Sequence, residues 1–336
     1  MTFGYQIYFT ERSHNRVVCW NPDSGTVKVV AGQNVTGTGR DQLLSDPYGL
    51  SIDSAGHLLV ADKRNNRVAR LTSRLDTVVS RDPDGHRGDR LIPSKNYPFC
   101  PTGIFTSTAG SLLVAYCDDG SIYRLQADGS LSLLIGVPRR LPAAIGAYRS
   151  IIPLQQVNQV ALFQPTSIVE GPDRTIYYIE RGFQAVRSYG PNRGISSIFR
   201  SGKSRGAGAG GQGLPKTMRL SDYSPDYPSS LTIGPDHELY LADANQRCVW
   251  QVDLAAATMF QVYATTPLPG RPSGGPSAIA FGPDGTLWIL DYGEGRIVGI
   301  ARTMGGWRRV GASCSTVYES APCVASEGAG IVCSAN

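Results

Sequence analysis

The sequence lacks three signals that would point directly to a function. No apolar run approaches the roughly 18 residues of a membrane-spanning helix, and no G-x-S-x-G motif marks a serine nucleophile. The glycine-rich segment SGKSRGAGAGG at 201–211 has Ser197 where a phosphate-binding loop requires its first glycine. We therefore expect no membrane span, no covalent nucleophile and no nucleotide-binding loop.

The charge balance gives little support to a nucleic-acid partner. The chain has 32 basic and 27 acidic residues, a formal net charge of +5. A dedicated nucleic-acid-binding domain usually gathers a larger basic excess on one face. Nucleic acid is therefore not favoured, although RNA binding through Arg139, Arg140, Lys203 and Arg205 stays open as a weaker alternative.

The sequence does contain a repeat. In each copy a proline opens a short apolar strand, a turn rich in Gly, Asp and Pro follows, and a second strand ends at a recurrent position that is usually acidic. The five copies read PYGLSIDSAGHLLVAD, PTGIFTSTAGSLLVAY, PTSIVEGPDRTIYYIE, PSSLTIGPDHELYLAD and PSAIAFGPDGTLWILD. Each copy continues into two further strands, which predicts four-stranded propeller blades over 47–81, 101–136, 165–200, 228–265 and 276–314.

The two ends of the chain supply a sixth blade. The N-terminus enters a second strand directly, with YQIYFTE, while EGAGIVCSAN near the C-terminus resembles a missing first strand. Residues 1–33 and 327–336 are therefore predicted to pair, which removes exposed sheet edges. The expected fold is all-β: one domain, residues 1–336, forming a six-bladed β-propeller closed by the C-terminal strand and the N-terminal blade.

These repeats resemble the NHL repeat. The proline-led strand, the AD strand end and the NRV-like strand match best at 47–81 and 228–265. The resemblance implies a six-bladed β-propeller. For function it implies only a range, because this and related six-bladed families include lyases, lactonases, strictosidine-synthase-like enzymes, hetero-Diels–Alderase-like cyclases and scaffolds that bind protein or RNA.

Strand direction predicts which face of the propeller carries the site. The short turns DSAG, GPDR, GPDH and GPDG fall on one face, whereas the long insertions 33–46, 82–100, 137–164 and 201–227 fall on the other. Long loops in a compact domain are often functional. A pocket is expected on this loop-rich face, near the blade at 165–200.

The four histidines do not support a zinc centre. His14 and His86 are expected on the loop-rich face, and His57 and His237 on the opposite face. A three-histidine site needs three on one face. We predict no metal ligands and no cofactor, with calcium in the channel left open.

A ring of polar residues marks the ends of the second strands: Glu11, Asp62, Tyr116, Glu180, Asp243 and Asp291. The carboxylates either cap their own loops by accepting backbone N–H bonds or include a cation site or general acid/base. The arginines of the repeat, Arg16, Arg67, Arg247 and Arg296, are expected to occupy equivalent positions and to be structural.

The repeat loses its NRV signature at 101–136 and 165–200, and departures from a structural rule are suspect as functional sites. The candidates there are Tyr116, Asp118, Asp119, Glu180, Arg181 and Phe183.

The favoured function is a small-molecule enzyme, a cofactor-independent cyclase or pericyclase, or a lyase. Glu180 would act as acid/base, Arg181 or Arg64 would stabilise an oxyanion, and Tyr116 would assist. Six residues are expected to contact the organic substrate: Tyr148, Arg149, Phe183, Asp118, Tyr223 and Tyr227. The alternatives are a scaffold that binds protein or glycan and a divalent-metal hydrolase that uses the acid ring, and a monomer is expected.

Cysteine placement bears on the compartment. Cys100 and Cys117 flank the first two strands of one blade, so antiparallel pairing brings them to the same end; Cys314 and Cys323 bracket a later loop. Two disulfides and glycosylation at the sequon of Asn34 would favour a secreted protein. A cytoplasmic protein remains the alternative, since no leader-like segment opens the sequence.

Overall fold

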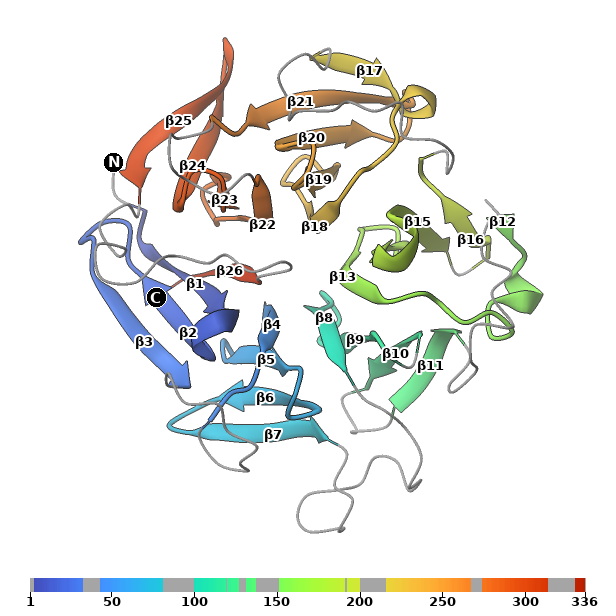
Figure 1. The fold of residues 1–336 in the computed structure, drawn as a ribbon, viewed down its shortest axis with the longest axis horizontal. Helices are drawn as coiled ribbons and strands as arrows, with labels where there is room; N and C mark the ends of the chain where they lie inside the picture. Colours follow the sequence, from blue (N-terminus) through green and yellow to red (C-terminus); the bar gives the residue numbers. More distant parts are fainter. Residues whose placement is uncertain are drawn as a thin grey trace.

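The computed structural model describes residues 3–32, 43–80, 100–118, 120–126, 131–136, 151–190, 192–199, 216–266, 274–313 and 330–335. Their strands form six antiparallel sheets that stand in a ring around a central channel (Figure 1). The predicted six-bladed β-propeller is confirmed.

Each blade has four main strands, which we name from the channel outward. Blade 1 has β26 (Ile331–Ala335), β1 (Tyr5–Glu11), β2 (Arg16–Trp20) and β3 (Val27–Gly32). Blade 2 has β4 (Pro47–Ile52), β5 (Leu58–Asp62), β6 (Arg67–Leu71) and β7 (Leu75–Ser80). Blade 3 has β8 (Pro101–Thr106), β9 (Leu112–Tyr116), β10 (Ser121–Leu125) and β11 (Leu131–Gly136).

Blade 4 has β13 (Pro165–Glu170), β14 (Ile176–Glu180), β15 (Ala185–Gly190) and β16 (Gly194–Ser197). Blade 5 has β18 (Pro228–Ile233), β19 (Leu239–Asp243), β20 (Cys248–Asp253) and β21 (Thr258–Ala264). Blade 6 has β22 (Pro276–Phe281), β23 (Leu287–Asp291), β24 (Arg296–Thr303) and β25 (Gly306–Ser313). The sequence did not predict two short outer strands, β12 (Ile151–Ile152) on blade 4 and β17 (Thr217–Arg219) on blade 5.

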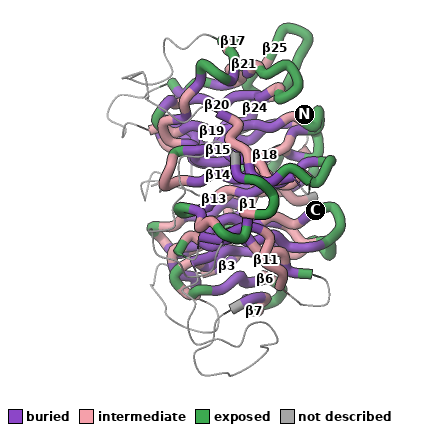
Figure 2. The backbone as a smooth tube through the Cα atoms, turned by 90° about the vertical axis from the view of Figure 1, so that its right-hand side faces the viewer, coloured by how far each residue is buried: buried purple, intermediate pink, exposed green. Residues whose placement is uncertain are grey.

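The hydrophobic core lies between blades. Six clusters of buried side chains each join two neighbouring blades. Second strands such as β5 and β19 are buried at every residue, because both faces of the sheet are covered. Figure 2 shows this pattern, with buried segments along the strands and exposed segments at the turns.

Both ends of the chain contribute to blade 1. β26 pairs antiparallel with β1, with Ile7 opposite Cys333, and forms the innermost strand of that blade. Trp20 and Trp288 pack edge to face at 5.3 Å between blades 1 and 6. In blade 3, a disulfide joins Cys100 to Cys117. No described helix is long and apolar enough to cross a membrane.

The two faces of the ring differ as strand direction predicts. The short turns between first and second strands share one conformation: Gly56, Gly110 and Gly285 have positive φ, and so do Arg174 and His237 at the equivalent place. We call this side the turn-rich face. Second strands end and third strands begin on the opposite side, the loop-rich face.

Candidate site at the loop-rich mouth of the channel

Three carboxylates of the ring are paired with arginines of their own blades. Glu11 pairs with Arg16, Asp62 lies 2.8 Å from Nε of Arg67, and Glu180 pairs with Arg187. Asp62 and Glu180 also accept backbone N–H bonds from the loops that lead into their blades, at Ser45 and Phe163 (both 2.7 Å).

The carboxylates of blades 5 and 6 are held by hydroxyls and backbone. Asp243 accepts hydrogen bonds from the Tyr223 hydroxyl at 2.8 Å and the Tyr227 N–H at 3.0 Å. Asp291 accepts from the Tyr263 hydroxyl at 2.6 Å and from the Glu294 N–H at 3.0 Å. All five ring carboxylates are buried. This geometry supports the loop-capping interpretation and argues against a cation site in the ring.

Burial raises the pKa of four of these groups, Asp62, Glu180, Asp243 and Asp291. Desolvation raises the pKa of Asp243 to about 6, despite hydrogen bonds from Gln246 and Tyr223. Desolvation also raises the pKa of Glu180, against the opposing charge of Arg187. Glu180 is 2% exposed and does not line the channel. Its expected role as a general acid/base is therefore not supported by its position.

One of the four repeated arginines is not equivalent to the others. Arg16, Arg67 and Arg296 stand opposite the ring carboxylates of their blades, but in blade 5 that position is Cys248. Arg247 instead takes the left-handed turn position, with φ of 55°. The predicted equivalence is therefore wrong for Arg247, because the turn has the same length as in the other three blades but the arginine precedes the paired position by one residue.

Glu180 does contribute to the mouth, because it fixes the loop on which Arg181 sits. The short helix η4 (Arg181–Phe183) is docked by backbone bonds from Arg181 N to Gln164 O at 3.1 Å and from Gly182 N to Phe163 O at 3.0 Å. A Cβ atom at Gly182 would lie 2.0 Å from the Phe163 ring, so glycine permits this approach. Arg181 is thereby held at the channel mouth.

Arg181 reaches across the mouth from blade 4 to blade 2. Its Nη1 donates a hydrogen bond of 3.0 Å to the hydroxyl of Tyr48. Its guanidinium carbon lies 4.9 Å from the centre of the Tyr227 ring, a cation–π contact with blade 5. Three blades therefore meet at this side chain.

Two further cations surround the Tyr48 ring. The guanidinium of Arg12 lies 4.7 Å from the ring centre and the ammonium of Lys63 lies 5.5 Å from it. Both contact one carboxylate, Asp46, at 2.6 Å and 3.2 Å. Burial alone would raise the pKa of Asp46, but Arg12 and Lys63 outweigh it and lower that pKa. We call Tyr48, Arg181, Arg12, Lys63 and Asp46 the mouth cluster.

The electrostatics of the mouth cluster favour a bound anion or a developing negative charge. Three cations face one carboxylate. Burial raises the pKa of Tyr48, and the charges of Arg181 and Arg12 do not cancel this effect. The phenol therefore stays neutral at pH 7, and since its oxygen accepts from Arg181, its proton is available to an acceptor on a ligand.

Sequence reasoning missed Tyr48, Arg12 and Lys63, although the repeat held a signal. The residue after the strand-opening proline is small and hydroxylated in the other copies: Thr102, Thr166, Ser229 and Ser277. Three of these hydroxyls bond to nearby backbone carbonyls. Only Tyr48 is large at this position, and it reaches the mouth instead.

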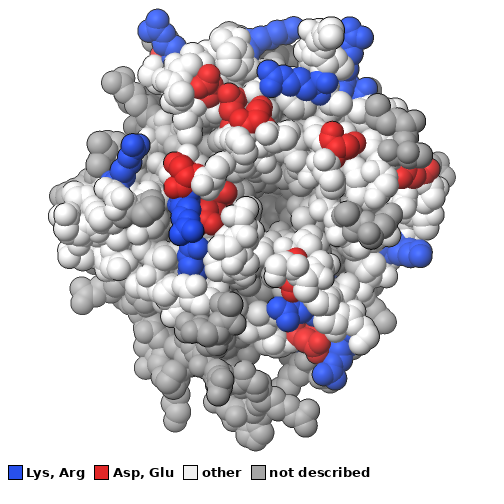
Figure 3. Space-filling model, turned by 180° about the vertical axis from the view of Figure 1, so that it is seen from behind, with Lys and Arg blue, Asp and Glu red and all other residues white. Residues whose placement is uncertain are grey.

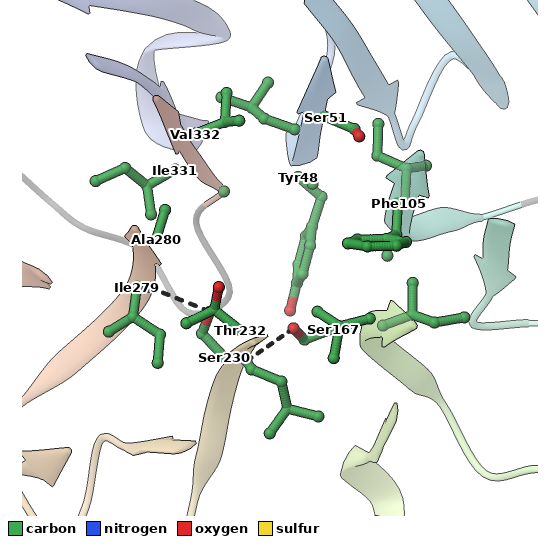
Figure 4. Close-up of a pocket in the computed structure, with 18 of the residues that line it drawn as sticks. Tyr48, Ser51, Phe105, Ser167, Ser230, Thr232, Ile279, Ala280, Ile331 and Val332 are labelled. Carbon is green, nitrogen blue, oxygen red and sulfur yellow. Dashed lines mark hydrogen bonds between the residues drawn. The ribbon is translucent and has the colours of Figure 1, made fainter. Parts of the chain in front are cut away.

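Below the mouth cluster, the channel encloses a cavity of about 330 Å³. Its wall is built from the innermost strands and contains no charged side chain among the lining residues that the structure describes. Figure 4 shows the Tyr48 ring reaching into this space, with Ser167, Ser230 and Thr232 on the opposite strands.

The other predicted site residues lie in different surroundings. Tyr116 is buried and packs edge to face on Tyr123 at 5.6 Å, Tyr223 is buried against Phe199 and Trp250, and Asp118 is exposed. Arg64 is exposed at the rim, 4.0 Å from Asp46. Phe183 packs on Phe163 at 5.3 Å. Asn34, Asp119, Tyr148, Arg149, Cys314 and Cys323 lie outside the described residues.

One group of side chains has the spacing of a metal site within the described part of the chain: Cys100, Cys117 and Asp118. The two sulfur atoms are joined in the disulfide. They therefore offer no thiolate to a metal, and this group does not fit a metal centre.

Comparison with known proteins agrees with the architecture. The NHL repeat model matches residues 44–71, which span β4, β5 and β6. The chain is a six-bladed β-propeller that carries an NHL repeat. No curated protein gives a significant match to the sequence.

Solved propellers resemble the whole ring. Virginiamycin B lyase from Staphylococcus aureus superposes with a TM-score of 0.52 at 16% identity, over 91% of this chain and 80% of the lyase. A gluconolactonase from Xanthomonas campestris gives 0.55 at 15% identity, over 85% and 79%. A chain of the nidogen/laminin complex gives 0.57 at 12% identity, over 98% of both chains. At these identities the likeness establishes the fold alone.

Proposed function

We propose that this propeller is a small-molecule enzyme of the lyase or cyclase class, with its active site at the mouth cluster. The observation that carries the proposal is the neutral phenol of Tyr48, bonded to Arg181 and flanked by Arg12 and Lys63. A hydrogen-bond donor surrounded by cations suits a substrate carbonyl that gains negative charge during reaction.

The chemistry requires few groups. Tyr48 would donate its proton in a hydrogen bond to the substrate carbonyl oxygen, and Arg181 would stabilise the charge through the phenol and directly. This activation serves cyclisation, in which the carbonyl draws electron density from the reacting atoms. Elimination through an enolate would in addition require a base for the proton on the neighbouring carbon, and Asp46 is the one carboxylate of the mouth cluster. Two of the similar structures are a lyase and a gluconolactonase, so catalysis on this fold has precedent.

A binding scaffold is the competing proposal, and the described surface supports it less. A scaffold would present a broad apolar patch. The exposed large apolar side chains among the described residues are instead scattered over several blades: Val29, Leu154, Phe163, Leu254, Phe260 and Met304.

The proposed location is the secretory route. The disulfide of blade 3 supports an oxidising compartment. Fractionation of cells that express the full-length natural protein, with a blot of medium and cytosol, tests this. Recovery only in the cytosol with free thiols at Cys100 and Cys117 would refute it.

The test of function compares variants on a metabolite extract of the source organism, followed by untargeted mass spectrometry. Tyr48→Phe and Arg181→Gln should abolish any product that the wild type forms. Arg74→Gln is the matched control, because Arg74 is 72% exposed on the turn-rich face and its one ion pair among the described residues is with Asp76. Products that persist in both mouth variants would refute the site, and an unchanged extract with the wild type would favour the scaffold.

A further inference from the structure

The channel below the mouth cluster is lined by apolar and uncharged side chains, whereas the mouth cluster itself is charged. Towards the turn-rich face, the ends of the innermost strands line it with Ile52, Phe105, Val169, Ile233 and Phe281. Figure 3 views the molecule from behind Figure 1 and shows a hollow at its centre that is bounded by uncharged residues. A charged ligand would lose its hydration there without a partner of opposite charge.

Three hydroxyls on this wall each accept one hydrogen bond from the protein. The oxygen of Ser167 accepts the Leu231 N–H at 3.0 Å and that of Ser230 accepts the Ile279 N–H at 3.2 Å, the two dashed bonds of Figure 4. The oxygen of Tyr48 accepts from Arg181. Within the described chain none of these three hydroxyls donates to a protein acceptor, so each can offer its proton to the channel.

Ser51 differs from these three residues, because its hydroxyl proton is used within the protein. Its hydroxyl also lines the channel, but it donates to the Thr106 hydroxyl at 3.0 Å and accepts the Thr106 N–H at 2.9 Å. Ser51 is therefore satisfied by the protein. The wall thus combines apolar surface with a few hydroxyls whose protons are not donated to the described protein.

We infer that the channel is a binding site for an uncharged, mainly apolar organic molecule that carries one hydrogen-bond acceptor, such as a ketone carbonyl. The apolar body is buried among the aliphatic strand ends, and the carbonyl oxygen accepts from Tyr48, Ser167 or Ser230. The volume of about 330 Å³ falls at the lower end of the range of ligand pockets. This inference requires no catalysis.

The route into the site runs from the turn-rich face. At the opposite end, the Tyr48 side chain and its bond to Arg181 span the channel, and the Tyr227 ring stacks on that guanidinium. At the turn-rich end, the hollow of Figure 3 leads inward between apolar side chains. A ligand therefore enters the channel from the turn-rich face, whereas the mouth cluster is reached from the loop-rich face.

Two probes of nearly the same shape test the inference. 2-Acetylnaphthalene carries a ketone, and 2-ethylnaphthalene has a methylene in its place. Equilibrium dialysis of each against the purified protein gives the two dissociation constants. We expect the ketone to bind about tenfold more tightly, the effect of one well-placed hydrogen bond in an apolar site. Equal affinities for the two probes would overturn the proposed role of the donors.

Variants of channel residues test whether the ketone probe binds in the channel. Ile233→Trp fills the channel and should weaken binding of the ketone at least tenfold, whereas Val29→Trp, on the outer strand β3 with Val29 50% exposed, should not. Circular dichroism checks that each variant folds. If Ile233→Trp does not fold, Ile52→Trp fills the channel from blade 2 in its place. Tyr48→Phe should narrow the preference for the ketone. Binding unchanged by a folded channel-filling variant would overturn the site.

Discussion

Nη1 of Arg181 and the hydroxyl of Tyr48 are 3.0 Å apart, and their hydrogen bond joins two blades that are not neighbours in the ring. Tyr48 belongs to blade 2 and Arg181 follows the second strand of blade 4. Contacts between adjacent blades make up the core, whereas this one spans the mouth of the channel. It therefore links two walls of the candidate site that are separated by blade 3.

A double-mutant cycle on Tyr48→Phe and Arg181→Met should reveal a coupling of about 1 kcal/mol in the free energy of unfolding, the usual net value of a partly buried hydrogen bond. Urea denaturation of the wild type, both single variants and the double variant gives the cycle. Tyr8→Phe is the control, since its hydroxyl bonds Gln6 at 2.8 Å and does not touch Arg181. A coupling of zero with Arg181 would contradict the bond across the mouth.

Glu180→Gln should lower the free energy of unfolding by about 3 kcal/mol, because Arg187 is then left buried without its counter-charge. Glu180 and Arg187 are both buried. Replacing both residues, by Glu180→Gln with Arg187→Met, should recover part of the loss. A Glu180→Gln variant that is as stable as the wild type but inactive would instead support the acid/base role that the sequence predicts for Glu180.

The contribution of Glu294 should depend on pH. Burial would raise its pKa, but hydrogen bonds from Arg309, the Thr266 N–H and Arg296 outweigh this and lower the pKa to about 2. A carboxylate with a depressed pKa stabilises the fold above its ordinary value near 4.5, and that stabilisation is lost as the pH falls towards 2.

Thermal denaturation of Glu294→Gln and the wild type between pH 2 and pH 7 measures this effect. The variant should be less stable at pH 7, and the difference should shrink steadily below about pH 4.5. The Asp222→Asn variant, at an exposed residue of the short helix η5 (Leu220–Asp222), serves as the comparison. A difference that stays constant down to pH 2 would contradict the assigned ion pairs.

Removal of the disulfide should destabilise blade 3. Cys100 and Cys117 are 17 residues apart, and a bond that closes a loop of this length contributes about 3 kcal/mol in the chain-entropy description. The Cys100→Ser, Cys117→Ser variant should melt at a lower temperature than the wild type. Reductant should lower the melting temperature of the wild type and leave that of the variant unchanged; a wild type insensitive to reductant would count against the bond.

The sequence predicted the ring because its evidence is local and repeated. The strand-opening prolines, the turns with left-handed residues and the recurrent strand-end acids each follow from backbone geometry within one blade. The loop-capping role of Asp62 and Asp243 could be anticipated for the same reason: their partners lie within about 20 residues along the chain. Arg247 shows the limit, since its turn has the same length as that of blade 2 but the arginine stands one position earlier in it.

The sequence by itself therefore determined the number of blades, the order of their strands and the face that carries the long loops, because these depend on period and strand direction. Only the tertiary structure decided which side chains meet at the channel. Tyr48 and Arg181 are 133 residues apart, and their contact exists because the ring places blades 2 and 4, with blade 3 between them, around one central channel. Local patterns carry no information about such a distance, so the strand-end acid Glu180 looked catalytic while Tyr48 went unnoticed.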